Sequence, residues 1–182
     1  PTLTAAGESA LTVRHEAFES PRAARTLRCC LVGPTNAGKS TMLNRLVNSN
    51  VSIVSDKIHT TLENTVGFMT NTHASHRPTQ VEFVDAPGAL GPHVPVLQRE
   101  MWEAVRSTDL ALVVVDAADD RKLGALSRFL SQLGERLDAQ EADDGRRTDT
   151  VLVLNKVDKV KPKTRLLELS EQLHKWHRFD WP

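Results

Sequence analysis

The sequence has no excess of either charge, no long apolar run and almost no cysteine, and each absence excludes a class of protein. Lys and Arg number 23, and Asp and Glu also number 23, so the formal net charge is zero. A domain that binds nucleic acid through its own surface is usually strongly basic, so we expect any contact with RNA to be made elsewhere. No apolar run approaches the length of about 20 residues that crosses a bilayer, and no secretory signal is visible.

The two cysteines, Cys29 and Cys30, are adjacent. Successive residues of a strand point to opposite faces of a sheet, so this pair is a poor candidate for a disulfide and provides no metal framework. A reducing compartment fits this usage. The chain starts with Pro1 rather than Met, which leads us to expect a processed chain or a piece of a longer one.

Apolar strands alternate with amphipathic helices, a pattern typical of a doubly wound α/β sheet with helices on both faces. Residues 1–24 are expected to form an extended N-terminal arm, and residues 25–182 one domain. The apolar runs "LALVVVDA" and "VLVL" are typical of strands buried on both faces of a parallel sheet. Strands are expected at 25–32, 64–71, 79–88, 109–117 and 151–158, helices at 39–48, 97–106, 121–137 and 163–176, and a charged loop at 139–150.

Residues 33–41, "GPTNAGKST", follow a predicted strand and open a predicted helix, and their spacing is the phosphate-binding P-loop pattern. In such a loop backbone N–H groups surround the phosphates, glycines let the backbone come close, and the helix N-terminus adds positive potential. Lys39 is expected to bridge the outer phosphates, and the Ser40 hydroxyl to bind Mg²⁺. The candidate phosphate-binding residues are Gly33, Asn36, Ala37, Gly38, Lys39, Ser40 and Thr41.

Residues 155–158, "NKVD", end another predicted strand. The carboxylate of Asp158 can accept hydrogen bonds from the ring N–H and the exocyclic amine of guanine. Adenine lacks this pair of donors and would leave the carboxylate unpaired, so the motif favours GTP or GDP over ATP. Asn155 and the stem of Lys156 are expected to support the base.

Residues 84–88, "VDAPG", lie between these two motifs in the sequence, again at the end of a predicted strand. Asp85 is expected to hold Mg²⁺ through a water, and the Gly88 N–H to meet the γ-phosphate. The carboxyl ends of parallel strands line one crevice. The three motifs therefore predict one site that binds GTP or GDP together with Mg²⁺.

With these motifs the chain resembles the Era family of the translation-factor-related GTPases over residues 25–180. The stretches "GPTNAGKSTMLNRL", "SIVSDKIHTTLENTVGF", "FVDAPG" and "NKVDKV" carry the resemblance. It implies that Thr60 or Thr61 closes over Mg²⁺ and the γ-phosphate; we favour Thr61, so the metal ligands would be Ser40, Thr61 and Asp85. It also implies that the last strand and helix of the G domain, the last guanine-contacting turn and the KH-type RNA-binding domain are absent from this chain.

At three positions near the expected catalytic centre, the chain departs from the residues that related GTPases carry. Leu62 stands where Era-type chains usually carry Arg, Ala86 where they carry Thr, and Ala89 where Ras-type GTPases carry the Gln that orients the attacking water. The resemblance implies that K⁺ at Asn36 assists instead, near the bridging oxygens where charge develops, although Asn36 also suits a tight loop by itself. Slow turnover is expected, with Lys39, Asn36 and Thr61 as the candidate catalytic residues.

The resemblance implies a GTP-hydrolysing switch that assists ribosome assembly through small-subunit rRNA maturation. Its partners would be a ribosomal subunit precursor and assembly factors, with rRNA contacts made by the absent domain. Two alternatives stay open: an inactive G domain that serves as a structural module of an assembly particle, and a related GTPase that acts on the large subunit or in tRNA modification. The missing start Met and the drift from bacterial-looking motifs favour the mitochondrion over the cytoplasm.

Two further expectations concern side chains outside the motifs. His174 and His177 lie three apart on a predicted helix, and two ligands are too few for a metal site, so they are interpreted as part of a charged helix end. Trp102 falls on the buried face of a predicted helix and is expected in the core.

Overall fold

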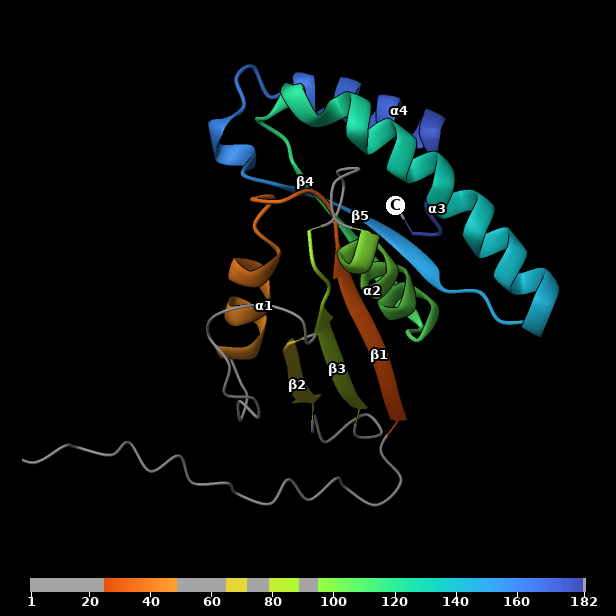
Figure 1. The fold of residues 1–182 in the computed structure, drawn as a ribbon. Helices are drawn as coiled ribbons and strands as arrows, with labels where there is room; N and C mark the ends of the chain where they lie inside the picture. The colour runs from red at the N-terminus through yellow and green to blue at the C-terminus, as the bar shows by residue number, and fades with distance from the viewer. Residues whose placement is uncertain (1–24, 49–64, 72–78, 89–94, 182) are drawn as a thin grey trace, which may run out of the picture.

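The computed structural model describes residues 25–48, 65–71, 79–88 and 95–181, and the centre of this part is a five-stranded sheet. Helices flank the sheet (Figure 1). The strands lie in the order β2-β3-β1-β4-β5; β2 is antiparallel to β3, and the other pairs are parallel. The predicted mostly parallel α/β sheet is confirmed. The strands are β1 Arg25–Val32, β2 Thr65–Asn71, β3 Thr79–Asp85, β4 Leu110–Asp116 and β5 Asp149–Asn155, and the helices are α1 Lys39–Asn48, α2 Pro95–Arg106, α3 Leu123–Asp144 and α4 Arg165–Trp176, with 3₁₀ turns η1 Asp120–Lys122 and η2 Val157–Lys159.

The two faces of the sheet have separate apolar cores. Cys30 of β1 belongs to the core that α2, α3 and α4 cover, whereas Cys29 belongs to the core on the side of α1, with Leu43. The two thiols are buried and free, and they lie on opposite faces as predicted. Burial raises the pKa of Cys29 to about 12 and that of Cys30 to about 11, so neither side chain is a reactive thiolate.

Helix α3 is longer than its sequence predicts. The charged stretch 139–150 was expected to be a loop, but α3 continues to Asp144 and ends at Gly145, whose φ of 68° is left-handed and whose N–H donates to Glu141 O. Gln140 is buried and donates to Arg106 O, which anchors this last part of the helix to the end of α2. Tertiary contacts thus override a local composition that reads as solvated.

The prediction for His177 is wrong. Instead of standing at a charged helix end, His177 is buried, with its Nε2 3.0 Å from the Thr150 hydroxyl on β5. The same hydroxyl donates to Asp180 Oδ2 at 2.8 Å, so the ring must donate from Nε2. Burial lowers the pKa of His177. The histidine therefore fixes the segment after α4 against the sheet. His174 is exposed; its Nδ1 lies 2.8 Å from Ser170 O in its own helix, and its ring contacts Phe179 edge-on.

Trp102 of α2 packs against the core as predicted, with its ring stacked on Phe129 of α3 at a centroid distance of 5.5 Å. Within the described ranges, no group of three or more His, Cys, Asp or Glu side chains is placed to hold a metal ion. None of the helices in those ranges combines the length and the hydropathy needed to cross a bilayer.

Candidate functional site

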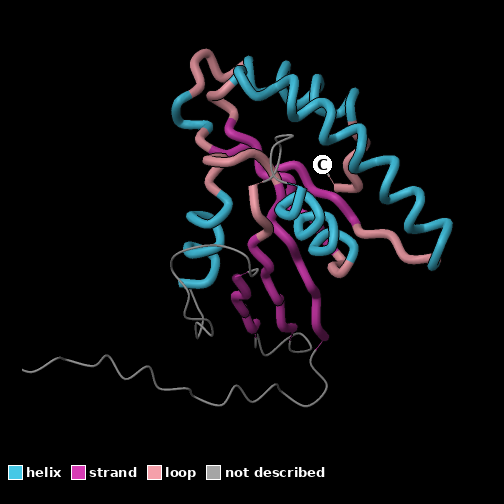
Figure 2. Tube along the Cα trace, in the orientation of Figure 1, coloured by secondary structure: helices cyan, strands magenta, loops and turns pink. Residues whose placement is uncertain are grey.

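The loop between β1 and α1 is a tight turn built against the neighbouring strand. Gly33 has a φ of 141°, and a Cβ there would lie 2.2 Å from the carbonyl oxygen of Val114 in β4. Asn36 has a left-handed φ of 63°, a conformation that Asn tolerates better than most residues. Figure 2 shows the loop beside the other connections that follow the parallel strands. The sequence pattern therefore produces the curled backbone that a phosphate cradle needs.

Lys39 of this loop points back over the backbone that precedes it. Its side chain is buried, and Nζ donates to Gly33 O at 3.1 Å and to Pro34 O at 3.0 Å. Burial lowers the pKa of Lys39, while the nearby Asp85 opposes that shift. Among the described residues, the buried ammonium is compensated by carbonyl dipoles rather than by a direct ion pair, so a phosphate would be a stronger partner.

Asp85, at the end of β3, lies beside the first turn of α1. The Ser40 hydroxyl donates to its Oδ2 at 2.6 Å, and its Oδ1 is buried without a hydrogen-bond partner in the described part of the chain. Burial raises the pKa of Asp85, although the bond from Ser40 and the charge of Lys39 pull it down. A buried, unsatisfied carboxylate oxygen beside a hydroxyl oxygen is the donor set that Mg²⁺ prefers, so these residues fit the predicted metal.

The Asp85→Asn variant is therefore expected to be more stable than the natural chain when no nucleotide or Mg²⁺ is present. A raised pKa means that the folded state disfavours the ionised carboxylate at neutral pH. The melting temperature should rise by about 2–4 °C, the shift that ~1 kcal/mol produces in a chain of this size, while Mg²⁺-dependent nucleotide binding is lost. Thermal melts of the metal-free proteins measure the first effect.

The raised pKa of Asp85 also predicts how the stability of the fold changes with pH. In the natural chain, stability from this group should increase as the pH falls from neutral through the raised pKa of Asp85, and should level off near the usual value of about 3.9. Asp85→Asn should remove this part of the profile. Asp158→Asn, at an exposed acid of the same site, serves as the control. A melting temperature for Asp85→Asn that is clearly below the natural value would contradict the expectation.

The "NKVD" motif contacts the same loop from the end of β5. Asn155 donates from Nδ2 to Ala37 O at 2.8 Å, and Lys156, with a left-handed φ of 58°, donates from Nζ to Asn36 O at 2.6 Å. Asp158 lies in η2 and is exposed, so its carboxylate is free to accept hydrogen bonds from a base. The motif holds the loop with its first two residues and offers its last to a ligand.

Gly88 completes the arrangement. A Cβ there would lie 3.0 Å from Lys39 Nζ, so the backbone after β3 runs beside the ammonium group. The structure thus brings together the described members of all three motifs. Ala37 is buried, whereas Asn36, Ser40 and Thr41 are exposed. The predicted ligands Thr60 and Thr61 lie outside the described residues, as do Leu62 and Ala89.

Sequence reasoning missed Asp116, the last residue of β4. Its Oδ2 accepts from Lys156 Nζ at 2.7 Å. Burial raises the pKa of Asp116, but the hydrogen bonds from Lys156 and from the Ala118 N–H, together with the charge of Lys156, lower it overall. The side chain is 13% exposed, so the pair is largely shielded. The sequence did contain a signal for Asp116, because it is an acid at the end of a predicted buried strand. The carboxyl ends of parallel strands converge, so such an acid lies near the site.

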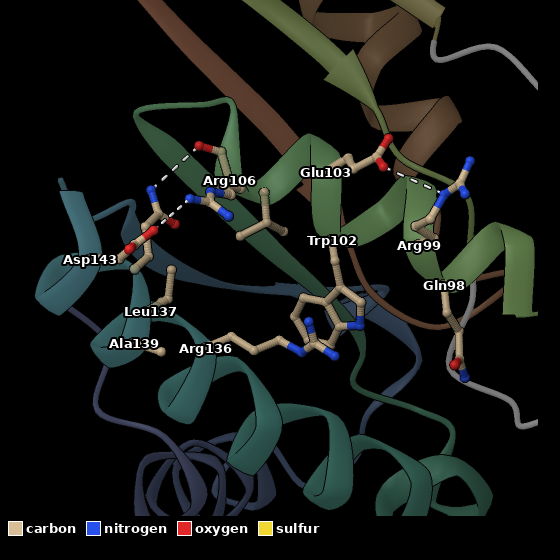
Figure 3. A pocket seen from close by; sticks show the side chains of 11 residues that line it. Gln98, Arg99, Trp102, Glu103, Arg106, Arg136, Leu137, Ala139 and Asp143 are labelled. Atoms are coloured by element: carbon tan, nitrogen blue, oxygen red, sulfur yellow. Dashed lines mark hydrogen bonds and ion pairs between the residues drawn. The ribbon is translucent and has the colours of Figure 1, made fainter.

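A separate cavity of about 660 Å³ lies between α2 and α3 (Figure 3). Trp102 lines it, with the Arg136 guanidinium 4.5 Å from the ring centroid, and an ion pair of Arg106 with Asp143 borders it. None of the predicted site residues contributes to its lining. The cavity is therefore distinct from the place where the three motifs meet.

Comparison with known proteins agrees with this site. A family model described as "50S ribosome-binding GTPase" matches residues 28–156. The mitochondrial GTPase Era of Salmo salar is 33% identical over 163 residues, which are 85% of this chain and 33% of that protein. GTPase Era of Agrobacterium fabrum is 36% identical over 157 residues, covering 82% of this chain and 43% of its own length.

Two solved structures show the same likeness. Aquifex aeolicus Era bound to GDP.AlF4- superposes with a TM-score of 0.56 at 25% identity, covering 84% of this chain and 48% of that one. Era in complex with MgGDPNP and nucleotides 1506–1542 of 16S ribosomal RNA gives a TM-score of 0.56 at 26% identity, covering 86% and 50%. The chain thus spans between a third and a half of the length of these relatives.

Proposed function

Because this chain belongs to the family of 50S ribosome-binding GTPases and has an Era-like G domain, we propose that its described site binds GTP with Mg²⁺ and hydrolyses it to GDP and phosphate. The observation that carries the proposal is the meeting of three motifs at one edge of the sheet. Lys39 lies beside Gly88, Ser40 bonds Asp85, and Asn155 bonds the backbone of the phosphate loop.

Each residue of the site has a separate proposed role. Lys39 exchanges the carbonyls of Gly33 and Pro34 for phosphate oxygens, a stronger charge-assisted interaction. Ser40 and Asp85 hold Mg²⁺, and Thr61 is proposed as its third protein ligand. Mg²⁺ held there would neutralise charge on the phosphate oxygens. The backbone of the loop and the ammonium of Lys39 stabilise the charge that develops in the transition state.

Guanine selectivity is assigned to Asp158, whose exposed carboxylate has no competing partner within the described residues. Thr60 and Thr61 are proposed to close over the γ-phosphate. K⁺ is proposed to bind at Asn36, which has a left-handed φ and is exposed. Since Ala89 cannot orient a water, turnover should be slow without a partner.

Ribosome assembly, with small-subunit rRNA as the target, is the proposed role of the whole protein. Its support is the likeness to Era, which has been solved with a segment of 16S ribosomal RNA. The zero net charge of this chain argues that the RNA contact is made by another part, for which we propose a KH-type domain. Assembly factors and a subunit precursor are the proposed partners, and the mitochondrion is the proposed compartment, supported by relatives that are mitochondrial Era proteins.

Nucleotide-dependent melting of the full-length protein tests the proposal, because a ligand that binds only the folded state must raise the melting temperature. GTP and GDP at 100 times their Kd should each add about 2.7 kcal/mol of stability, and ATP should add none. Phosphate release that rises with K⁺, but not with Na⁺, would support the cation at Asn36. If no nucleotide shifts the melt, the domain is a structural module and the proposal fails.

A further inference from the structure

The phosphate loop has five consecutive carbonyl groups, from Gly33 to Ala37, and every one accepts a hydrogen bond from a side chain. Lys39 takes the first two, and Lys156 and Asn155 take the last two. The carbonyl in the middle, that of Thr35, accepts from Lys122 Nζ at 2.8 Å. Lys122 belongs to none of the three motifs and lies at the end of η1, where α3 begins.

An ion pair with Asp119 holds Lys122 in place. Asp119 Oδ2 lies 3.4 Å from Lys122 Nζ, and its carboxylate is only 10% exposed. Arg121 bonds both carboxylate oxygens: its backbone N–H and Nε donate to Oδ1 at 3.3 and 2.8 Å, and a terminal guanidinium nitrogen donates to Oδ2 at 3.3 Å. The arrangement repeats a neighbouring one, in which Asp116 holds Lys156 against the next carbonyl of the loop. Two Asp–Lys pairs, Asp119–Lys122 and Asp116–Lys156, therefore anchor two consecutive peptide groups of the loop.

Anchoring a carbonyl also orients the following N–H. A peptide group is planar and trans, so its C=O and N–H point in opposite directions. The bond from Lys122 to Thr35 O thus directs the N–H of Asn36 to the other side of the loop. The ammonium of Lys122 also acts on Lys39, whose pKa it helps to lower, so the two positive charges lie within electrostatic reach.

We propose that Lys122 is a positioning residue of the nucleotide site: it fixes the Thr35–Asn36 peptide with its N–H available to phosphate and adds positive potential, and so raises the affinity for GDP and GTP. This inference rests on the proposed function of the site. It requires no direct contact between Lys122 and the ligand, because the effect passes through the backbone of the loop.

Titration of the full-length protein with fluorescent GDP and with a non-hydrolysable GTP analogue tests this role. Lys122→Met removes the donor and the charge but keeps the length of the stem, and should weaken binding about tenfold, as expected for one charge-assisted hydrogen bond. Lys122→Arg, which keeps the charge and the donors, should restore affinity to within about threefold of the natural value. Arg121→Met is the matched control, because Arg121 pairs with the same Asp119 without reaching the loop; its affinity should stay unchanged.

The nucleotide-induced rise in melting temperature, taken for each variant relative to its own ligand-free melt, separates binding from stability. A Lys122→Met variant that melts lower but keeps its nucleotide affinity overturns the inference, as does a loss shared equally by Arg121→Met or left unrepaired by Lys122→Arg. These results would leave the proposed function intact. If the natural protein binds neither GDP nor GTP, the proposed function and the inference fail together.

Discussion

Replacing Asp158 by Asn is expected to weaken GTP and GDP binding by at least about 100-fold, because a site built around a polar group loses much more than a hydrogen bond when its partner no longer matches. The carboxylate only accepts hydrogen bonds, whereas the amide places an NH₂ donor against one of guanine's own donors. Xanthine has a carbonyl where guanine has its amine, so it matches the amide. The variant should therefore gain affinity for xanthine nucleotides.

Competition between GTP and XTP for the natural protein and for Asp158→Asn measures this exchange. Asp158 is exposed and bonds no other described side chain, so the ligand-free melting temperature should stay within about 1 °C of the natural value, as for most surface substitutions. Loss of GTP binding together with a large drop in that temperature would point to misfolding. An unchanged preference for GTP would show that another group reads the base.

The second large effect is expected at Gly38, where two of the motifs meet. A Cβ on Gly38 would lie 2.3 Å from Asn155 Nδ2, and the backbone there has a φ of 98°. Gly38→Ala should force Asn155 away from Ala37 O, its partner at 2.8 Å. We expect a loss of stability of about 3 kcal/mol from strain and the broken bond, and about 100-fold weaker GDP binding, equivalent to ~2.7 kcal/mol.

A double-mutant cycle with Asn155→Ala tests the physical cause. If the clash with Asn155 carries part of the cost, Gly38→Ala should be less damaging in the Asn155→Ala background, with a coupling of about 1 kcal/mol. Gly124→Ala in α3 is the matched control, since a Cβ there meets nothing within 4 Å. Additive stability losses in the cycle would place the whole cost in the backbone strain and rule out the contact.

The sequence predicted the sheet and the meeting of the three motifs at one edge of it; the roles of the individual site residues stay predictions. The P-loop spacing predicted the turn after β1 because glycine and asparagine at fixed positions allow only a few backbone paths. The runs in β4 and β5 predicted buried parallel strands because both faces must be apolar. The placement of Asp85 beside Ser40 followed, since parallel strands end at one edge.

The main failures were contacts between distant segments. The end of α3 depends on Gln140 reaching Arg106, and the burial of His177 depends on Thr150 of β5. Asp116 and Lys122 act on the phosphate loop, but no short motif contains them. A single sequence shows which residues can form a helix end or a charged surface, but not which partner the fold brings to them.

The order of the strands has a consequence for how the chain is made. β1 is the first strand in the described part of the chain, yet it lies in the middle of the sheet: Arg28 pairs with Glu82 of β3, and Cys29 pairs with Leu110 of β4. A ribosome delivers about 5–20 residues per second, so several seconds separate the synthesis of β1 from that of its second neighbour. Until β4 has emerged, the apolar end of β1 has an unpaired edge, and the central pairings form through slow, long-range contacts. Synthesis of this domain is therefore expected to depend on chaperones that shield β1 during that interval.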